Sequence, residues 1–242
     1  MRNQRQIVKL TVLCAVVACL GLLLDACKQN DNDLVIDFKR DYYPVDSGHY
    51  LVYDVDSIFS YSSDFSKDTV RYQLMEVVGD TFYDGMNELN YELNIYRRPN
   101  SSSQWTYDRK WYVKKTNVNI QKSEDDIRFV KVVFPPANDM TWNGNIYVPT
   151  SDPYRMFQNW EYRYEKVDEP YQINSFNFDS SVTVMCVNDS NFVSKHLRKE
   201  VYAKHVGLVF EEFQLKEKQF PEAWDTGRWT GFSIQKRLVE HN

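Results

Sequence analysis

Side chains that could carry chemistry are few and scattered in this 242-residue chain. The four histidines are His49, His196, His205 and His241. His196 and His205 lie nine residues apart across an expected strand, so the spacing sets no pair on one face to hold zinc. Asp54 and Asp56 share an expected strand face, but without further oxygen ligands at loop spacing they suit a solvated face better than a cation site. We therefore predict no metal, cofactor or catalytic residue.

The sequence motifs of common enzymes are also absent. There is no nucleophile elbow, phosphate-binding loop, dinucleotide loop or helical zinc motif. A hydrolase that uses scattered carboxylates stays open as an alternative, because such a pair needs no local motif. Glu124-Asp125-Asp126 is expected to form a solvated acidic turn. Cys186 lies in an apolar strand, which favours a buried thiol over a nucleophile.

Four tryptophans lie in or beside loop-like stretches rich in Ser, Asn, Asp or Gly: Trp105, Trp142, Trp224 and Trp229. Loops on a β scaffold often carry function, so these side chains are candidate contacts for a glycan, a peptide or an apolar ligand. The alternative is that they fill the core of a sheet that contains few leucines, and we favour that alternative.

The first 26 residues form a separate segment. A basic start precedes residues 10–24, which are fifteen residues without a charge, and Asp25 follows. A membrane-spanning helix takes about twenty apolar residues, so this run suits the core of a signal peptide. We expect residues 1–26 to direct export and to be removed.

Cys27 follows this leader. Leu24-Asp25-Ala26-Cys27 resembles the bacterial lipobox, although Asp25 departs from the usual small or apolar residue. The resemblance implies that Cys27 is lipidated and anchors the protein to the outer membrane. Cys19 also follows a small residue, but cutting there would leave an apolar stretch in the product. Residues 27–37 are expected to form an acidic flexible tether.

The start of this tether resembles the acidic signal that sends Bacteroidetes lipoproteins to the cell surface, which favours that side over the periplasmic face. Two tripeptides, Asp56-Ser57-Ile58 and Asp68-Thr69-Val70, resemble the acceptor pattern for O-glycosylation of exported Bacteroidetes proteins. The resemblance makes Ser57 and Thr69 candidate glycosylation sites.

The composition favours strands over helices. The chain has 17 Tyr and 14 Phe, and residues 27–242 contain 22 Val but only 9 Leu and 3 Ala. The net charge is −5, and it is −7 once residues 1–26 are excluded, which argues against nucleic-acid binding. We predict an all-β, mainly antiparallel fold with little helix, in one domain over residues 38–242.

Alternating apolar and polar residues locate the strands. The expected strands cover residues 49–61, 69–78, 89–95, 110–121, 127–134, 160–165, 178–187, 201–204, 208–216 and 229–238. Asp84-Gly85 and Asn143-Gly144 are expected to be turns, and residues 154–159 to form one or two helical turns.

The order of several segments resembles a Bacteroidetes outer-membrane lipoprotein family that has no assigned activity. The resemblance rests on the Y-Y-P element at residues 42–55, on Phe134-Pro135, on W-N-G-N at residues 142–145 and on residues 200–209 with the Y-A-x-x-V-G-L-V pattern. It implies one large curved sheet or half-barrel and supplies no catalytic residue. Gly207 is expected in a strand-entry turn or bulge, where φ can be positive.

Together these features predict a lipid-anchored, non-catalytic envelope protein that binds a ligand or supports structure. The alternatives are a secreted-side hydrolase that uses scattered carboxylates, with a glycan as its candidate substrate, and an envelope assembly subunit. The expected partners are the membrane, through the lipid, and a glycan, peptide or apolar ligand. The oligomeric state is left open.

Overall fold

The computed structural model describes residues 37–61, 64–218 and 228–242. The expected leader, Cys27 and Trp224 lie outside the described residues. The chain divides after Asp37 into two units, and Phe38–Asn242 forms the second. No helix among the described residues has the length and apolar character needed to cross a bilayer.

Twelve strands of the described residues form one sheet. The first six are β1 (Tyr50–Ser60), β2 (Lys67–Tyr83), β3 (Leu89–Arg98), β4 (Thr106–Lys115), β5 (Asn119–Glu124) and β6 (Ile127–Val133). The second six are β7 (Thr141–Trp142), β8 (Tyr162–Ile173), β9 (Phe176–Ser190), β10 (Ser194–Ala203), β11 (Gly207–Glu217) and β12 (Thr230–His241). Two short 3₁₀ helices, η2 (Arg40–Tyr42) and η3 (Tyr154–Phe157), accompany the sheet.

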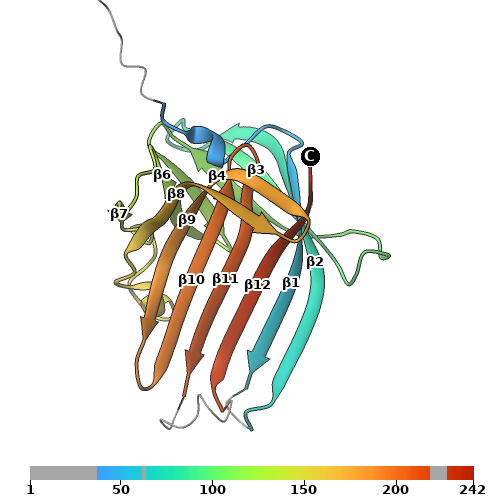
Figure 1. Cartoon of the computed structure of the whole chain (residues 1–242), viewed down its shortest axis with the longest axis vertical. Helices are drawn as coiled ribbons and strands as arrows, with labels where there is room; N and C mark the ends of the chain where they lie inside the picture. Colours follow the sequence, from blue (N-terminus) through green and yellow to red (C-terminus); the bar gives the residue numbers. More distant parts are fainter. Residues whose placement is uncertain (1–36, 62–63, 219–227) are drawn as a thin grey trace, which may run out of the picture. The chain divides into compact units, whose positions relative to one another are not determined.

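Every neighbouring pair in the sheet is antiparallel, in the order β6-β5-β4-β3-β2-β1-β12-β11-β10-β9-β8-β7. Consecutive strands are therefore neighbours, apart from β6 and β7, which are the two edge strands, and β1 also pairs with β12. The long strands β9 to β12, β1 and β2 lie side by side in Figure 1. The expected all-β, mainly antiparallel fold is confirmed.

The sheet curls until its two edge strands meet. The amide of Val130 in β6 donates to the carbonyl of Gly144, just after β7, at 2.7 Å. Trp142 Nε1 donates to the Val130 carbonyl at 2.9 Å. The Tyr164 hydroxyl accepts from the Val133 amide at 3.0 Å and donates to the Val133 carbonyl at 2.7 Å. We call this junction the seam, and the expected large curved sheet is confirmed.

The expected strand over residues 110–121 is wrong in one respect, because a turn divides it into β4 and β5. Thr116 Oγ1 accepts hydrogen bonds from the amides of Val118 and Asn119, at 3.1 and 2.9 Å. A threonine hydroxyl that bonds the backbone in this way competes with the sheet ladder and favours a turn.

Several strands are longer than the sequence predicts, and β8 and β10 are examples. β10 begins at Ser194 rather than at residue 201, and β8 continues to Ile173. In β10 the inward positions include Arg198 and Glu200, which are 3% and 1% exposed. Charged side chains at inward positions remove the apolar alternation by which a strand is recognised. At the start of β11, Gly207 has the expected positive φ, at 100°.

Candidate functional site

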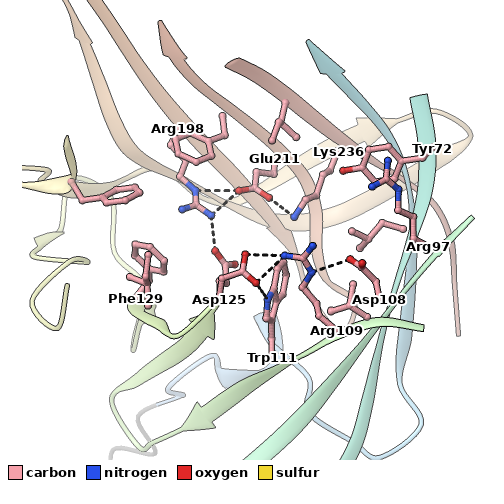
Figure 2. Close-up of a pocket in the computed structure, with 17 residues that line it drawn as sticks. Tyr72, Arg97, Asp108, Arg109, Trp111, Asp125, Phe129, Arg198, Glu211 and Lys236 are labelled. Atoms are coloured by element: carbon pink, nitrogen blue, oxygen red, sulfur yellow. Dashed lines mark hydrogen bonds and ion pairs between the residues drawn. The ribbon is translucent and has the colours of Figure 1, made fainter. Parts of the chain in front are cut away.

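A cavity of about 300 Å³ lies against the inner face of the sheet. Its apolar lining comes from six strands and includes Tyr72, Ile95, Trp111, Phe129, Phe213 and Ile234. We call this space the aromatic cavity. Its charged lining divides into an exposed set, which includes Arg97 and Arg109, and a more buried set, which includes Arg198 and Glu211. In Figure 2 the Arg198–Glu211–Lys236 chain lies across the cavity from Trp111 and Arg109.

The buried set belongs to a larger network of eight charged side chains, which we call the ion ring. Its acids are Glu76, Glu124, Glu200 and Glu211. Its bases are Lys122, Lys131, Arg198 and Lys236. None of the eight side chains is more than 15% exposed. The charges sum to zero, so the ring brings no net charge into the interior.

Acids and bases alternate around the ring, and the first half joins β2, β5 and β6. Lys122 Nζ lies 3.1 Å from Glu76 Oε2 and 3.4 Å from Glu124 Oε1. Lys131 Nζ lies 3.5 Å from Glu124 Oε1 and 2.6 Å from Glu200 Oε1. The Lys131–Glu200 contact joins β6 to β10 across the interior, so the ring connects walls that are far apart in the strand order.

The second half of the ring returns along β10, β11 and β12. Arg198 Nε lies 3.1 Å from Glu200 Oε1, and Arg198 Nη2 lies 2.7 Å from Glu211 Oε1. Lys236 Nζ lies 2.8 Å from Glu211 Oε2 and 4.0 Å from Glu76 Oε1, which closes the ring. Arg198 Nη2 also reaches Glu124 at 3.2 Å. Burying these charges is tolerable because each one faces an opposite charge on both sides.

The ring lowers the pKa of two of its carboxyl groups, those of Glu124 and Glu211. Burial would raise the pKa of Glu124, but Lys131 and other bases of the ring hold it well below its usual range. Burial would likewise raise the pKa of Glu211, and Lys236 outweighs burial and lowers it. In return Glu211 raises the pKa of Lys236 against the effect of burial. At neutral pH these groups are charged and mutually compensated.

Three other tyrosines, Tyr43, Tyr53 and Tyr202, lie close to the ring and do not line the aromatic cavity. The Tyr202 hydroxyl donates to Glu200 Oε2 at 2.6 Å, and the rings of Tyr43 and Tyr202 lie 5.8 Å apart. The Tyr53 hydroxyl donates to the Leu208 carbonyl at 2.9 Å. The interior therefore has a filled aromatic region in contact with the ring, in addition to the open cavity that the ring lines.

At the exposed part of the cavity, Arg109 organises the acidic side chains. Its Nη1 donates to both carboxylate oxygens of Asp125, at 2.9 and 3.0 Å, and its Nε donates to Asp108 at 2.9 Å. Trp111 Nε1 also donates to Asp125, at 3.2 Å. These contacts fix the Trp111 ring as a wall of the cavity (Figure 2).

The structure places three of the predicted tryptophans at separate positions, and none lines the aromatic cavity. Trp105 lies under the Arg98 guanidinium, 4.1 Å from the ring centroid. Trp142 belongs to the seam, and Trp229 is buried. Trp224 lies outside the described residues. A ligand role for these four side chains stays a prediction.

The other predicted positions differ in how far they are exposed to solvent. Ser57 is 2% exposed, whereas Thr69 is exposed, so a glycan at Ser57 would have to be attached before folding. Cys186 is fully buried, as expected, and burial raises the pKa of its thiol well above the usual range. Glu124 contradicts the expected solvated turn, because it lies in the ion ring while Asp125 and Asp126 are exposed.

Neither the ion ring nor the cavity walls were predicted from the sequence. One local sign exists: Lys131 interrupts the apolar run Phe129–Val133 at a position that apolar residues surround. A lysine inside such a run suggests a buried partner, but the sequence does not say which acid supplies it. No group of His, Cys, Asp and Glu that could hold a metal ion occurs within residues 37–61, 64–218 and 228–242.

No protein-family model matches the chain, and no curated protein matches it. Two solved structures are similar. One is a protein from Bacteroides fragilis described as exported and as having a YmcC-like fold, with 11% identity and a TM-score of 0.37 over 82% of this chain and 98% of the other. The second, from Parabacteroides distasonis, is described as a lipoprotein, with 12% identity and a TM-score of 0.40 over 83% and 98%. With TM-scores this low, neither likeness bears on function.

Proposed function

We propose that the protein is a non-catalytic binding protein of the cell envelope that holds a small ligand in the aromatic cavity. The observation that carries this proposal is the cavity itself, about 300 Å³ in volume and walled by Trp111, Phe129 and Phe213. Small-molecule sites are concave, mostly apolar and supplied with a few fixed polar groups, and cavities of this volume are common among them. The fixed polar groups here are those of the ion ring.

The leader and the cysteine motif supply the location. In this proposal residues 1–26 direct export, and lipid on Cys27 holds the protein at the outer membrane, with the cell surface favoured over the periplasmic face. The tether of residues 27–37 then links the lipid to the curled sheet. A binding site at a membrane surface would sample ligands that are present in, or close to, the envelope.

The ionisation of the cavity carboxylates favours binding over hydrolysis. A glycosidase needs one carboxyl group that keeps its proton and acts as general acid. Glu124 and Glu211, which line the cavity, both have a lowered pKa because ring bases surround them. Neither carboxyl group would hold a proton near neutral pH.

The strand edges favour binding over assembly by strand addition. The seam occupies the edges of β6 and β7. β8 pairs with β7 only at Tyr162 and Arg163. Beyond these residues β8 carries Pro170 and three register shifts against β9. A proline and irregular pairing both hinder the addition of another strand.

Binding of the neutral fluorescent dye N-phenylnaphthylamine tests the cavity. The dye is apolar and of suitable size, so we expect saturable binding with one site per chain, measured by fluorescence titration and by calorimetry. In Ile234→Trp the larger side chain would occupy the cavity that Ile234 lines, and binding should be lost.

The matched control is Val118→Trp, which adds the same side chain at an exposed turn that is 57% exposed and should leave binding unchanged. Circular dichroism of both variants establishes that they are folded. Absence of saturable binding to the wild type, or equal binding by folded Ile234→Trp, would overturn the proposal.

A further inference from the structure

We propose that the ligand is an anionic amphiphile, with an acidic head group held by Arg97, next to the positive charge of Arg98, and an apolar body in the aromatic cavity. The inference rests on the proposed function and adds the charge of the ligand. It is carried by a local excess of positive charge in an acidic protein, at the place where two cavities adjoin.

A second cavity, of about 330 Å³, lies beside the aromatic cavity. Tyr72, Arg97 and Asp108 line both cavities, so the two spaces share a wall. The second cavity lies where β3 ends: Gln73 and Arg98 are the last partners between β2 and β3, and β2 continues to Lys67 without β3 beside it. The end of β3 therefore leaves room beside Arg97 and Arg98.

The two linings together contain more basic than acidic side chains. Six basic residues line the two cavities: Arg71, Arg97, Arg98, Arg109, Arg198 and Lys236. Four acidic residues line them: Asp108, Glu124, Asp125 and Glu211. The excess is two positive charges, whereas the whole chain has a net charge of −5. Such a concentration of one sign draws ligands of the opposite sign.

The acidic side chains of the lining are already paired. Asp108 and Asp125 bind Arg109, and Glu124 and Glu211 bind bases of the ion ring. A cationic ligand would therefore have to displace an existing ion pair. The ion ring is neutral in itself, so it favours a ligand of neither sign.

Arg97 and Arg98 differ from the other bases because neither forms an ion pair with a carboxylate of the described residues. The Arg97 guanidinium lies over the Tyr72 ring, 3.7 Å from its centroid. Stacking on an aromatic face holds a guanidinium in place and leaves its edge donors available.

Two hydrogen bonds in series hold the Arg98 side chain. Its Nε donates to Gln73 Oε1 at 2.7 Å, and Gln73 Nε2 donates to Asp54 Oδ1 at 2.8 Å. The guanidinium also lies 4.1 Å from the centroid of Trp105. Gln73 and Asp54 lie on the sheet face opposite to Leu74 and Arg97, so Arg98 adds positive charge to the second cavity from that other face. Trp105 packs on Arg98 and lines neither cavity.

The probes are two dyes with the same aromatic body, anilinonaphthalenesulfonate, which is anionic, and N-phenylnaphthylamine, which lacks the sulfonate. We expect the wild type to bind the anionic dye about tenfold or more tightly than the neutral dye, because charge-assisted hydrogen bonds reach only the sulfonate. In Arg97→Gln the affinity for the anionic dye should fall by about tenfold. The affinity for the neutral dye should fall much less, because that dye has no acid group for Arg97 to bind.

The matched control is Arg128→Gln. Arg128 also lies over a tyrosine, 5.5 Å from the Tyr147 centroid, but it lines neither cavity. Its substitution should leave both dyes unaffected. Arg97→Lys keeps the charge and should retain part of the preference, which separates a loss of charge from a loss of packing on Tyr72.

The outcomes distinguish the inference from the proposed function. If the wild type binds both dyes equally and Arg97→Gln changes neither, the anionic ligand is excluded while the cavity remains a binding site. If neither dye binds saturably, the proposed function fails as well. Loss of both dyes in a folded Arg97→Gln variant would mean that Arg97 only supports the cavity wall, and would overturn the inference.

Discussion

The ion pairs of the ion ring are buried, so replacing a single side chain should change the free energy of unfolding. Isolated surface ion pairs contribute little to the free energy of unfolding, whereas removing one partner of a buried pair leaves an uncompensated charge. Glu211 is only 3% exposed and accepts from Arg198 and Lys236. Its removal would leave the ring with four bases and three acids.

At this scale we predict that Glu211→Gln lowers the free energy of unfolding by about 3–5 kcal/mol at pH 7. The loss should shrink in acid. The folded pKa of Glu211 is lowered, so its carboxylate stabilises the fold above the unfolded pKa of about 4.3, and this contribution is lost as the pH falls further. Urea unfolding at pH 7 and at more acidic values, followed by tryptophan fluorescence, measures the difference.

Glu217→Gln is the control, because Glu217 is exposed on the same strand and its change should be within about 0.5 kcal/mol. A difference between wild type and Glu211→Gln that stays constant from neutral to acid pH would contradict the prediction.

Among the elements, the seam determines how far the sheet closes. β7 contains only two residues, and the turn after it supplies the Gly144 carbonyl that β6 binds. Asn143-Gly144 lies in a turn, as expected, and the φ of Gly144 is not positive. The glycine is required instead by close packing: a Cβ there would lie 2.5 Å from the ring of Tyr162.

We predict that Gly144→Ala destabilises the protein by about 1–3 kcal/mol, because the ring cannot move away easily. Tyr162 is fully buried and its hydroxyl donates to Asn145 at 2.9 Å. Gly85→Ala is the control, since a Cβ at Gly85 meets nothing within 4 Å. The control should be neutral or more stable by about 0.4–1 kcal/mol. Thermal and urea unfolding measure the stability of both variants. Equal stabilities of the two variants would contradict the role of close packing at the seam.

For the whole molecule, the proposed location depends on residues 1–37 and the proposed binding on residues 38–242. A single acyl chain binds a membrane only marginally, but the two or three chains that a lipobox cysteine receives make a stable anchor. The two functions can therefore be tested separately.

We predict that Cys27→Ala moves the protein from the membrane to the soluble fraction in cell fractionation, while dye binding by the purified protein is unchanged. Cys19→Ala is the matched control and should remain in the membrane fraction. If Cys27→Ala stays in the membrane, the lipobox assignment is wrong. Protease treatment of intact cells then distinguishes the cell surface from the periplasmic face.

Local patterns in the chain were sufficient to recognise most of the strands. Alternation along a strand reflects burial of one face, which is a property of a few consecutive residues. This explains why β3 and β11 were located closely, and why β-branched and aromatic residues indicated a sheet. It also explains the failures at β8 and β10, where charged or irregular positions interrupt the alternation.

Only the tertiary structure determines the ion ring and the aromatic cavity. Lys131 and Glu200 are 69 residues apart in the chain, and they meet because the sheet curls and brings β6 opposite β10. Pairing between distant strands depends on the register of every strand between them, which no local pattern specifies. Thus the chain reveals a β-rich protein with a candidate lipid anchor, whereas closure of the sheet determines which charges are buried together and where space for a ligand remains.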